Sequence, residues 1–163
     1  MRRILASALV ASLAAFPLAA LDLATPEGVV LLTVSGNVAV TNVGDTAQLD
    51  LAMLEEMGIR TIETSTIWTK GVIKFEGVPL DVFVERLGLT GETLRATAIN
   101  EYAVTVPLSD AVEGGPIIAY RMDGQEMSVR DKGPLWIIYP YDSDSDFRSE
   151  VVYARSIWQL DRI

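Results

Sequence analysis

Short apolar runs separated by turn residues dominate this chain. Residues 29–34 read VVLLTV and residues 135–139 read LWIIY, and both are rich in β-branched or aromatic side chains. Runs of this kind, bounded by Gly, Pro, Asn or Asp, predict β-strands. We expect residues 135–139 to form a central strand with alternate side chains buried, and Asp123-Gly124 to form a hairpin turn. The predicted strands cover residues 29–34, 38–41, 60–68, 72–77, 93–99, 102–106, 117–122, 126–130, 135–139 and 152–160.

Two segments have helical periodicity instead. The clearer one begins at Pro79, which suits a first helical turn because its missing N–H is not needed there, and it ends at Gly88. A second helix is predicted over residues 50–58, capped by Asp50. Many short strands with two short helices, and no regular alternation of the two, predict one α+β domain with a largely β core over residues 21–163. The apolar face of the clearer helix follows the i, i+3, i+4, i+7 spacing: Leu80, Phe83, Val84 and Leu87.

The first 20 residues have the composition of a secretory signal peptide. Arg2 and Arg3 precede an apolar run, residues 4–15, that is too short to span a bilayer, and small residues follow Pro17. The arginine pair also suggests a twin-arginine signal, but its neighbours fit that longer motif poorly. We therefore expect export of an unfolded chain, cleavage near Leu21, and a periplasmic mature protein that does not insert into the membrane.

Acidic residues outnumber basic ones, which restricts the classes of partner. The full chain has 13 Lys and Arg against 22 Asp and Glu. Because residues 1–20 contain two Arg and no acidic residue, the expected mature chain has a net charge of −11. Such a charge repels nucleic acid and anionic lipid surfaces. We therefore expect no nucleic-acid partner.

The chain contains neither cysteine nor histidine. The missing histidine removes the usual general base near neutral pH and the commonest transition-metal ligand. The two absences together exclude cysteine nucleophiles, Ser-His-Asp triads, Cys/His zinc sites and iron–sulfur ligation.

Two charged segments each allow a functional and a structural interpretation. Residues 142–146 read DSDSD, which resembles the start of a calcium loop, but Phe147 stands where that loop needs Gly and Tyr153 where it needs Glu. A solvated acidic turn is the favoured interpretation. Arg130 and Lys132 precede Gly133 and could bind an anion. The alternative there is a turn in which Asp131 pairs locally with one of these cations.

The order of several motifs resembles the molybdopterin-binding domain of the sulfite oxidase family, especially its small exported versions. The motifs are FEGVPL at residues 75–80, NEYAVTVPL at 100–108, IIAYRMDG at 117–124, GPLWIIYP at 133–140 and SIWQL at 156–160. The resemblance covers most of residues 29–163. It implies a mixed α+β fold with a largely β core, in agreement with the strand pattern.

The resemblance also implies a cofactor site. The family transfers oxygen atoms at molybdenum held by a pterin dithiolene and one protein cysteine, which is expected near the end of the strand predicted at residues 60–68. This chain has the residues TSTIW at 64–68 there, and a hydroxyl cannot simply replace a thiolate. Molybdopterin is therefore a candidate ligand by resemblance only, and we expect no molybdenum. The candidate cofactor-binding residues are Thr64, Thr66, Trp68, Asn100, Tyr102, Arg130, Lys132 and Trp136.

The function predicted on this basis is a periplasmic module without redox activity. Arg130 and Lys132 would offer charge to a small anionic ligand, and Trp68 and Trp136 would offer flat surface. A periplasmic or membrane signalling protein is an equally open partner. The alternatives are a molybdopterin-dependent oxidoreductase with unusual metal ligation, and a structural partner protein with no small ligand. The family inserts its cofactor in the cytoplasm and exports the folded product, whereas this signal favours export of an unfolded chain.

Overall fold

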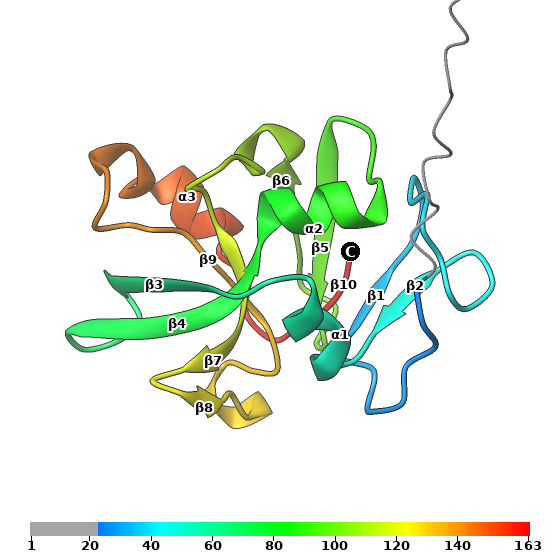
Figure 1. Ribbon diagram of the computed structural model, residues 1–163. Helices are drawn as coiled ribbons and strands as arrows, with labels where there is room; N and C mark the ends of the chain where they lie inside the picture. The colour runs from blue at the N-terminus through cyan, green and yellow to red at the C-terminus, as the bar shows by residue number, and fades with distance from the viewer. Residues whose placement is uncertain (1–22) are drawn as a thin grey trace, which may run out of the picture.

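The computed structural model describes residues 23–163, in which two five-stranded sheets pack together with three short α-helices (Figure 1). The predicted signal peptide lies outside the described residues. The first sheet has the order β2-β1-β10-β5-β6, with β1 and β10 parallel and the other pairs antiparallel. Its strands are β1 (Leu32–Val34), β2 (Ala47–Leu49), β5 (Thr93–Ala98), β6 (Ala103–Pro107) and β10 (Leu160–Arg162).

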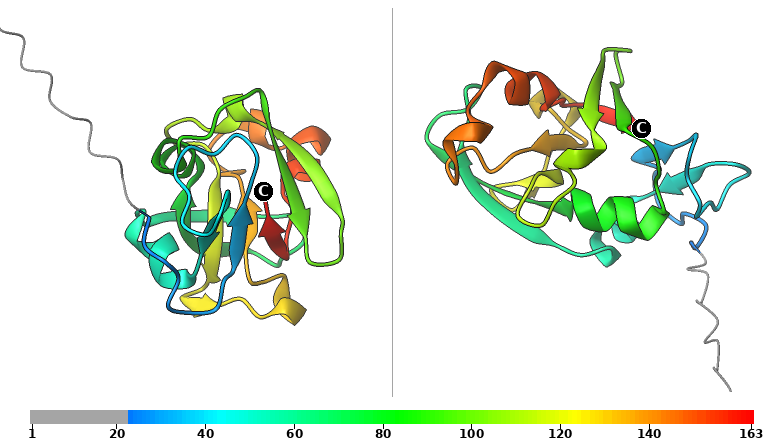
Figure 2. Two further views of the ribbon diagram at one scale, coloured as in Figure 1. Left: turned by 90° about the vertical axis from the view of Figure 1, so that its right-hand side faces the viewer. Right: turned by 90° about the horizontal axis from the view of Figure 1, so that it is seen from above.

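The second sheet is entirely antiparallel and centres on β7. The β3–β4 hairpin pairs with one side of β7 through β4, and β8 and β9 pair with successive parts of its length. The right-hand view in Figure 2 shows this hairpin as a long curved ribbon that reaches away from the first sheet. The strands are β3 (Arg60–Ser65), β4 (Val72–Pro79), β7 (Ile117–Met122), β8 (Gln125–Glu126) and β9 (Trp136–Ile138).

The helices are short and lie in the connections between strands. They are α1 (Leu51–Glu56), α2 (Leu80–Leu87) and α3 (Glu150–Arg155), with 3₁₀ turns η1 (Leu108–Asp110), η2 (Val129–Asp131) and η3 (Ser145–Phe147). The helix α2 follows its predicted pattern: three of its four periodic apolar residues are buried, and Gly88 ends it in the left-handed conformation at φ 60°. This mixture of a largely β core and short helices confirms the predicted α+β class.

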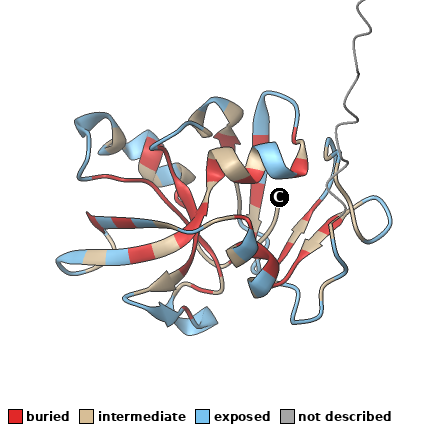
Figure 3. Cartoon of the chain, in the orientation of Figure 1, coloured by how far each residue is buried: buried red, intermediate tan, exposed pale blue. Residues whose placement is uncertain are grey.

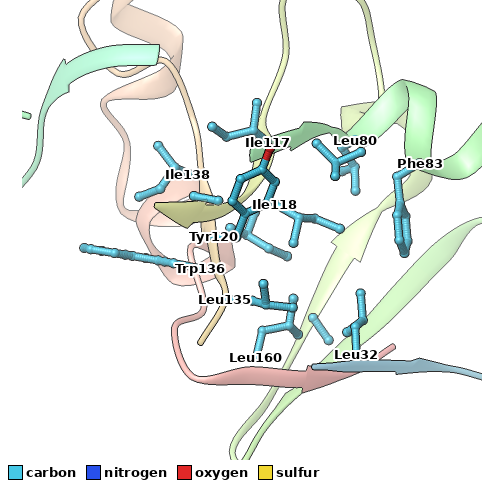
Figure 4. Packing of buried hydrophobic residues seen from close by; sticks show 14 of the residues in the cluster. Leu32, Leu80, Phe83, Ile117, Ile118, Tyr120, Leu135, Trp136, Ile138 and Leu160 are labelled. Atoms are coloured by element: carbon cyan, nitrogen blue, oxygen red, sulfur yellow. The ribbon is translucent and has the colours of Figure 1, made fainter. Parts of the chain in front are cut away.

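The core forms where the two sheets face each other, and every strand except the short, exposed β8 contributes buried residues to it (Figure 3). Leu32 and Leu160 from the first sheet meet Ile118 and Leu135 from the region of the second, and Phe83 of α2 closes one side (Figure 4). These side chains are 0% exposed. At roughly 1.5–3 kcal/mol for each fully buried large apolar side chain, this burial supplies the main driving force for folding without any disulfide.

Three of the strand predictions were wrong. Of residues 152–160, predicted as one strand, only Leu160 lies in a strand, β10. The others form the end of α3 and the turn before β10, because Ser149 caps a helix by accepting a hydrogen bond from Val152 N–H at 3.4 Å. Residues 38–41 form no strand, while β2 follows the turn that was expected to end that segment. Residues 126–130 return as a strand only at their first position before η2 begins.

The prediction of alternating burial in residues 135–139 was also wrong. Every residue of this segment is buried, and β9 covers only Trp136–Ile138. The segment pairs with β7 on one side, while Ile137 N–H donates to Ile157 O at 2.9 Å on the other. Besides these two paired edges, both faces of the strand are buried, so it has no solvent face and its sequence need not alternate.

Asp50 ties the N-terminal segment to α1. Its Oδ1 accepts from Met53 N–H at 3.0 Å, and its Oδ2 accepts from the N–H groups of Glu27 and Gly28 at 3.0 and 2.8 Å. These backbone hydrogen bonds, that from Met53 foremost, lower the pKa of the Asp50 carboxyl below its ordinary value. The predicted cap therefore holds a second chain segment in addition to its own helix.

We expect Asp50→Asn to reduce the free energy of unfolding at pH 7 by about 1–2 kcal/mol, because an amide has one acceptor oxygen for three donors. A lowered folded-state pKa stabilises the fold above the unfolded value, and that stability is lost as the pH falls through the folded-state value. The wild type should therefore lose more stability than the variant on acidification below about pH 5. Urea unfolding at several pH values measures this, with Asp45→Asn in an exposed turn as the control. Parallel pH profiles for wild type and Asp50→Asn would contradict it.

Candidate functional site

Aromatic side chains from distant parts of the sequence gather around Trp68, which lies in the β3–β4 turn. Its ring centroid is 5.7 Å from those of Trp136 and Tyr153, 5.6 Å from that of Trp158 and 6.4 Å from that of Tyr141. All four contacts are edge-to-face, and each such pair contributes about 0.5–1.5 kcal/mol beyond its buried area. The tip of the hairpin is therefore anchored to α3 and to the turn before β10.

A pocket of about 290 Å³ opens beside this cluster, and we call it the aromatic pocket. Three segments form it: the β3–β4 turn, the β5–β6 turn, and the stretch from α3 to β10. Three of the predicted site residues, Trp68, Asn100 and Tyr102, come together in its wall. The complete lining is Trp68, Ala98, Asn100, Tyr102, Tyr153, Ala154, Ser156, Ile157, Trp158 and Gln159.

Unusual backbone conformations surround the aromatic pocket. Four non-glycine residues among residues 23–163 have positive φ, and three of them lie here: Glu101 at 68°, Lys132 at 71° and Gln159 at 53°. Gln159 N–H donates to Lys132 O at 3.0 Å, so two of these strained residues hold each other. Each costs about 1–3 kcal/mol, and such strain is concentrated at ligand-binding and catalytic sites. The strained backbone residues and the aromatic side chains therefore lie in the same region of the fold.

The two cationic residues predicted for the site, Arg130 and Lys132, do not line the aromatic pocket. Lys132 places its Nζ over the rings of Trp158 and Trp136, 4.2 and 5.5 Å from their centroids. Arg130 lies in η2 and is exposed. Asp131 accepts from Ser128 Oγ at 2.7 Å and forms no ion pair with either cation within the described part of the chain. The local ion pair considered from the sequence is therefore replaced by a serine–aspartate contact.

Trp136 does not offer the flat open surface expected from the sequence. It is 0% exposed, its indole N–H donates to Ser156 O at 3.1 Å, and its ring packs against Phe75 at 5.5 Å. The buried ring also packs edge-to-face against the rings of Trp68 and Trp158. Of the tryptophans, Trp68 and Trp158 reach the pocket wall.

The hydroxyl groups at the end of β3 are engaged in hydrogen bonds within the fold. Thr64 Oγ1 donates to Ser65 O at 3.2 Å and accepts from Asp142 N–H at 3.1 Å, and Ser65 Oγ donates to Asp142 Oδ1 at 2.7 Å. Thr66 Oγ1 accepts from the N–H groups of Trp68 and Thr69, both at 3.0 Å. These residues build a turn and fasten it to the segment after β9.

Asp142 is the partner that these hydroxyls share. Hydrogen bonds from the Ser65 backbone and side chain, followed by Arg148, lower the pKa of its carboxyl. Further along, Asp144 caps η3 by accepting from Asp146 N–H at 2.9 Å. Within residues 23–163, no three His, Cys, Asp or Glu side chains are grouped so that they could hold a metal ion. The acidic segment thus forms hydrogen-bonded turns.

Several pocket residues were not identified from the sequence. Tyr153 and Gln159 were assigned to one predicted strand, and Ser156 was noted only within a motif. Ser156 Oγ accepts from Tyr141 O–H at 2.6 Å and donates to Val152 O at 2.9 Å. Burial raises the pKa of the Tyr141 phenol to about 12, so it remains a donor at neutral pH. A Ser149 cap followed by Glu150 was the available signal for α3.

A comparison with known protein families identifies the family of this chain. The family described as the oxidoreductase molybdopterin binding domain matches residues 37–142. This chain belongs to that family. The match confirms the resemblance drawn from the sequence motifs, and it ends before α3, so the wall of the aromatic pocket from Tyr153 to Gln159 lies outside the matched region. No curated protein matches the chain.

This molybdopterin-binding domain lacks the cysteine through which, by the family resemblance, the protein would hold molybdenum. The sequence has no cysteine to supply a thiolate, and the hydroxyls at the end of β3 are neutral groups already bonded to Asp142 or to backbone N–H groups. The family relationship therefore holds for the fold, while the metal-binding chemistry of the family lacks its protein ligand here. Among residues 23–163, no helix combines the length and the apolar composition needed to cross a membrane.

Proposed function

We propose that this protein is a non-redox ligand-binding or accessory module built on the molybdopterin-binding fold. The observation that carries the proposal is the replacement of metal ligation by internal hydrogen bonds. Where the resemblance implies a cysteine, this chain has Thr64, Ser65 and Thr66, and their hydroxyls all have partners within the fold. A hydroxyl bonded in this way stabilises the fold, and it does not supply the thiolate that the family resemblance implies.

The ligand-binding side of the proposal rests on the aromatic pocket. Its volume suits a small organic molecule, and its wall combines aromatic rings with a few polar groups, as small-molecule sites do. The three strained residues beside it give an independent reason to favour this site. The small anion expected from Arg130 and Lys132 gains no support from the wall, because neither side chain belongs to it.

We further propose that the protein acts as an accessory module in the periplasm. The predicted signal peptide supports export, and the net charge of −11 after its removal favours a soluble module with a protein or small-molecule partner. A periplasmic or membrane signalling protein that responds to the occupied pocket is the partner we propose. Export as an unfolded chain agrees with a module that needs no preloaded cofactor.

Metal analysis of protein purified from its native cell envelope fraction tests the non-redox proposal. We expect substoichiometric molybdenum, no pterin fluorescence after oxidation, and an N-terminus near Leu21 by mass spectrometry of the intact protein. About one molybdenum per chain with a pterin signal would instead establish the alternative, an oxidoreductase with atypical metal ligation. Mass spectrometry of small molecules released from the same preparation addresses the natural ligand.

A further inference from the structure

The wall of the aromatic pocket carries no charged side chain. Its ten residues are aromatic, aliphatic or neutral polar. The nearby cation, Lys132, is held over the rings of Trp158 and Trp136 and is not part of the wall. A phosphate or carboxylate entering this pocket would lose water without gaining a cation, which costs several kcal/mol in an apolar site.

The pocket does have neutral hydrogen-bonding groups that remain available. Asn100 Oδ1 accepts from Tyr102 N–H at 3.2 Å, and Gln159 Nε2 donates to Val129 O at 2.8 Å. Their other amide atoms, Asn100 Nδ2 and Gln159 Oε1, form no hydrogen bond with residues 23–163, and neither do the hydroxyls of Tyr102 and Tyr153. The wall therefore offers a donor, an acceptor and two phenols beside apolar ring surfaces.

The β5–β6 turn that supplies part of the wall also carries an ion pair. Glu101 lies between the wall residues Asn100 and Tyr102, and its side chain is 73% exposed. Its Oε1 accepts from Arg162 Nη2 at 2.7 Å, so its charge is largely balanced by the guanidinium. The charge that opposes the approach of anions is therefore the net negative charge of the whole chain.

We propose that the aromatic pocket selects an uncharged, flat heterocyclic ligand and rejects phosphorylated forms of the same ring. This inference rests on the proposed ligand-binding function and specifies its ligand class. Ring faces of Trp68 or Trp158 supply stacking surface, and the amides of Asn100 and Gln159 bind ring-edge donors and acceptors. The selectivity is opposite to that expected of a site for a phosphate-bearing cofactor, which would need cations in its wall.

Matched ligand pairs that differ only in a phosphate test this selectivity. We would titrate the full mature chain with uridine, inosine and riboflavin, and with their monophosphates, and follow binding by calorimetry. At least one uncharged compound should bind saturably, and its monophosphate should bind at least about tenfold more weakly, equivalent to about 1.4 kcal/mol. Tyr102→Ala should weaken that binding, whereas Ile59→Ala, an exposed apolar residue outside the wall, should not.

A gain-of-function variant separates charge selectivity from loss of structure. Ala154 lines the pocket from an exposed position in α3, where an arginine side chain can be accommodated. Ala154→Arg should raise the affinity for the monophosphate and leave that for the uncharged partner nearly unchanged. Equal or tighter binding of the monophosphates by the wild type would overturn the selectivity but leave the ligand-binding function intact. No saturable binding of any uncharged compound would also overturn it, whereas stoichiometric molybdenum would overturn the proposed function.

Discussion

Replacing Gly77 with alanine should lower the free energy of unfolding by at least about 3 kcal/mol, because the new side chain would overlap the neighbouring strand. A Cβ at this position would lie 2.2 Å from Ile118 O and 2.6 Å from Ala119 Cα. The register between β4 and β7 shifts between Glu76 and Gly77, and this bulge brings the two backbones together. Since the clashing atoms belong to a central strand, a side-chain rotation cannot relieve the overlap. Urea unfolding followed by tryptophan fluorescence measures the loss.

A second glycine provides the matched control for this substitution. Gly124, in the hairpin turn, has φ 77°, and a Cβ at this position would have open space around it to 4 Å. Gly124→Ala should therefore cost only about 1–2 kcal/mol, the strain of a left-handed backbone. If Gly77→Ala were no more destabilising than Gly124→Ala, the close approach of β4 to β7 would not be the reason for glycine at this position.

Replacing Asp110 with alanine should also cost about 3 kcal/mol, because two groups would lose their partner together. Arg155 Nη1 donates to both carboxylate oxygens of Asp110, at 3.1 and 2.9 Å, and Tyr139 O–H donates to Oδ2 at 2.7 Å. Asp110 is only 15% exposed, so water replaces these contacts poorly. Burial, followed by the bond to Asp110, raises the pKa of the Tyr139 phenol, which therefore remains a donor. The network joins η1 to α3 and to Tyr139, which directly follows β9.

Two further variants help to interpret the loss of stability expected for Asp110→Ala. Tyr139→Phe isolates the hydrogen bond, and Lys74→Ala gives the effect of breaking a more exposed ion pair. Tyr139→Phe removes one hydrogen bond and leaves the ion pair, so we expect a loss of about 1 kcal/mol. Lys74 pairs with Glu76 at 2.8 Å from a half-exposed position, and its removal should change the urea midpoint little. Should Asp110→Ala resemble Lys74→Ala, the network would contribute no more than a solvent-exposed ion pair. Retention of α3 in the variant can be checked by hydrogen exchange of its amides.

The elements that the sequence predicts correctly are those whose signal is local. The helix α2 has a proline start, a periodic apolar face and a glycine end within ten residues, and β3, β4, β5 and β7 follow runs with their own turn signals. The errors at residues 135–139 and 152–160 have a common cause. These two segments pack against each other, so their burial and conformation depend on contacts that neither run contains.

The candidate site also has some features that the sequence predicts and others that depend on the tertiary structure. Chemical exclusions follow from composition, because a chain without cysteine cannot supply a thiolate wherever it folds. The grouping of Trp68, Asn100 and Tyr102 was approached through a family resemblance, whereas the contributions of Tyr153 and Gln159 were not. Lys132 shows the limit most clearly: its charge was visible in the sequence, but its position over Trp158 was not.

By itself, the sequence determined the fold class, the family and the loss of the sulfur ligand, because residue types, short-range periodicity and motif order are properties of the chain. Only the tertiary structure decided that the hydroxyls of Thr64 and Ser65 are bonded to Asp142, 77 or 78 residues away. It likewise decided that an uncharged aromatic pocket forms between three distant turns. The physical reason is that hydrogen bonds and ring contacts act over a few ångströms in space, and the distance between two residues along the chain does not specify which pairs come that close.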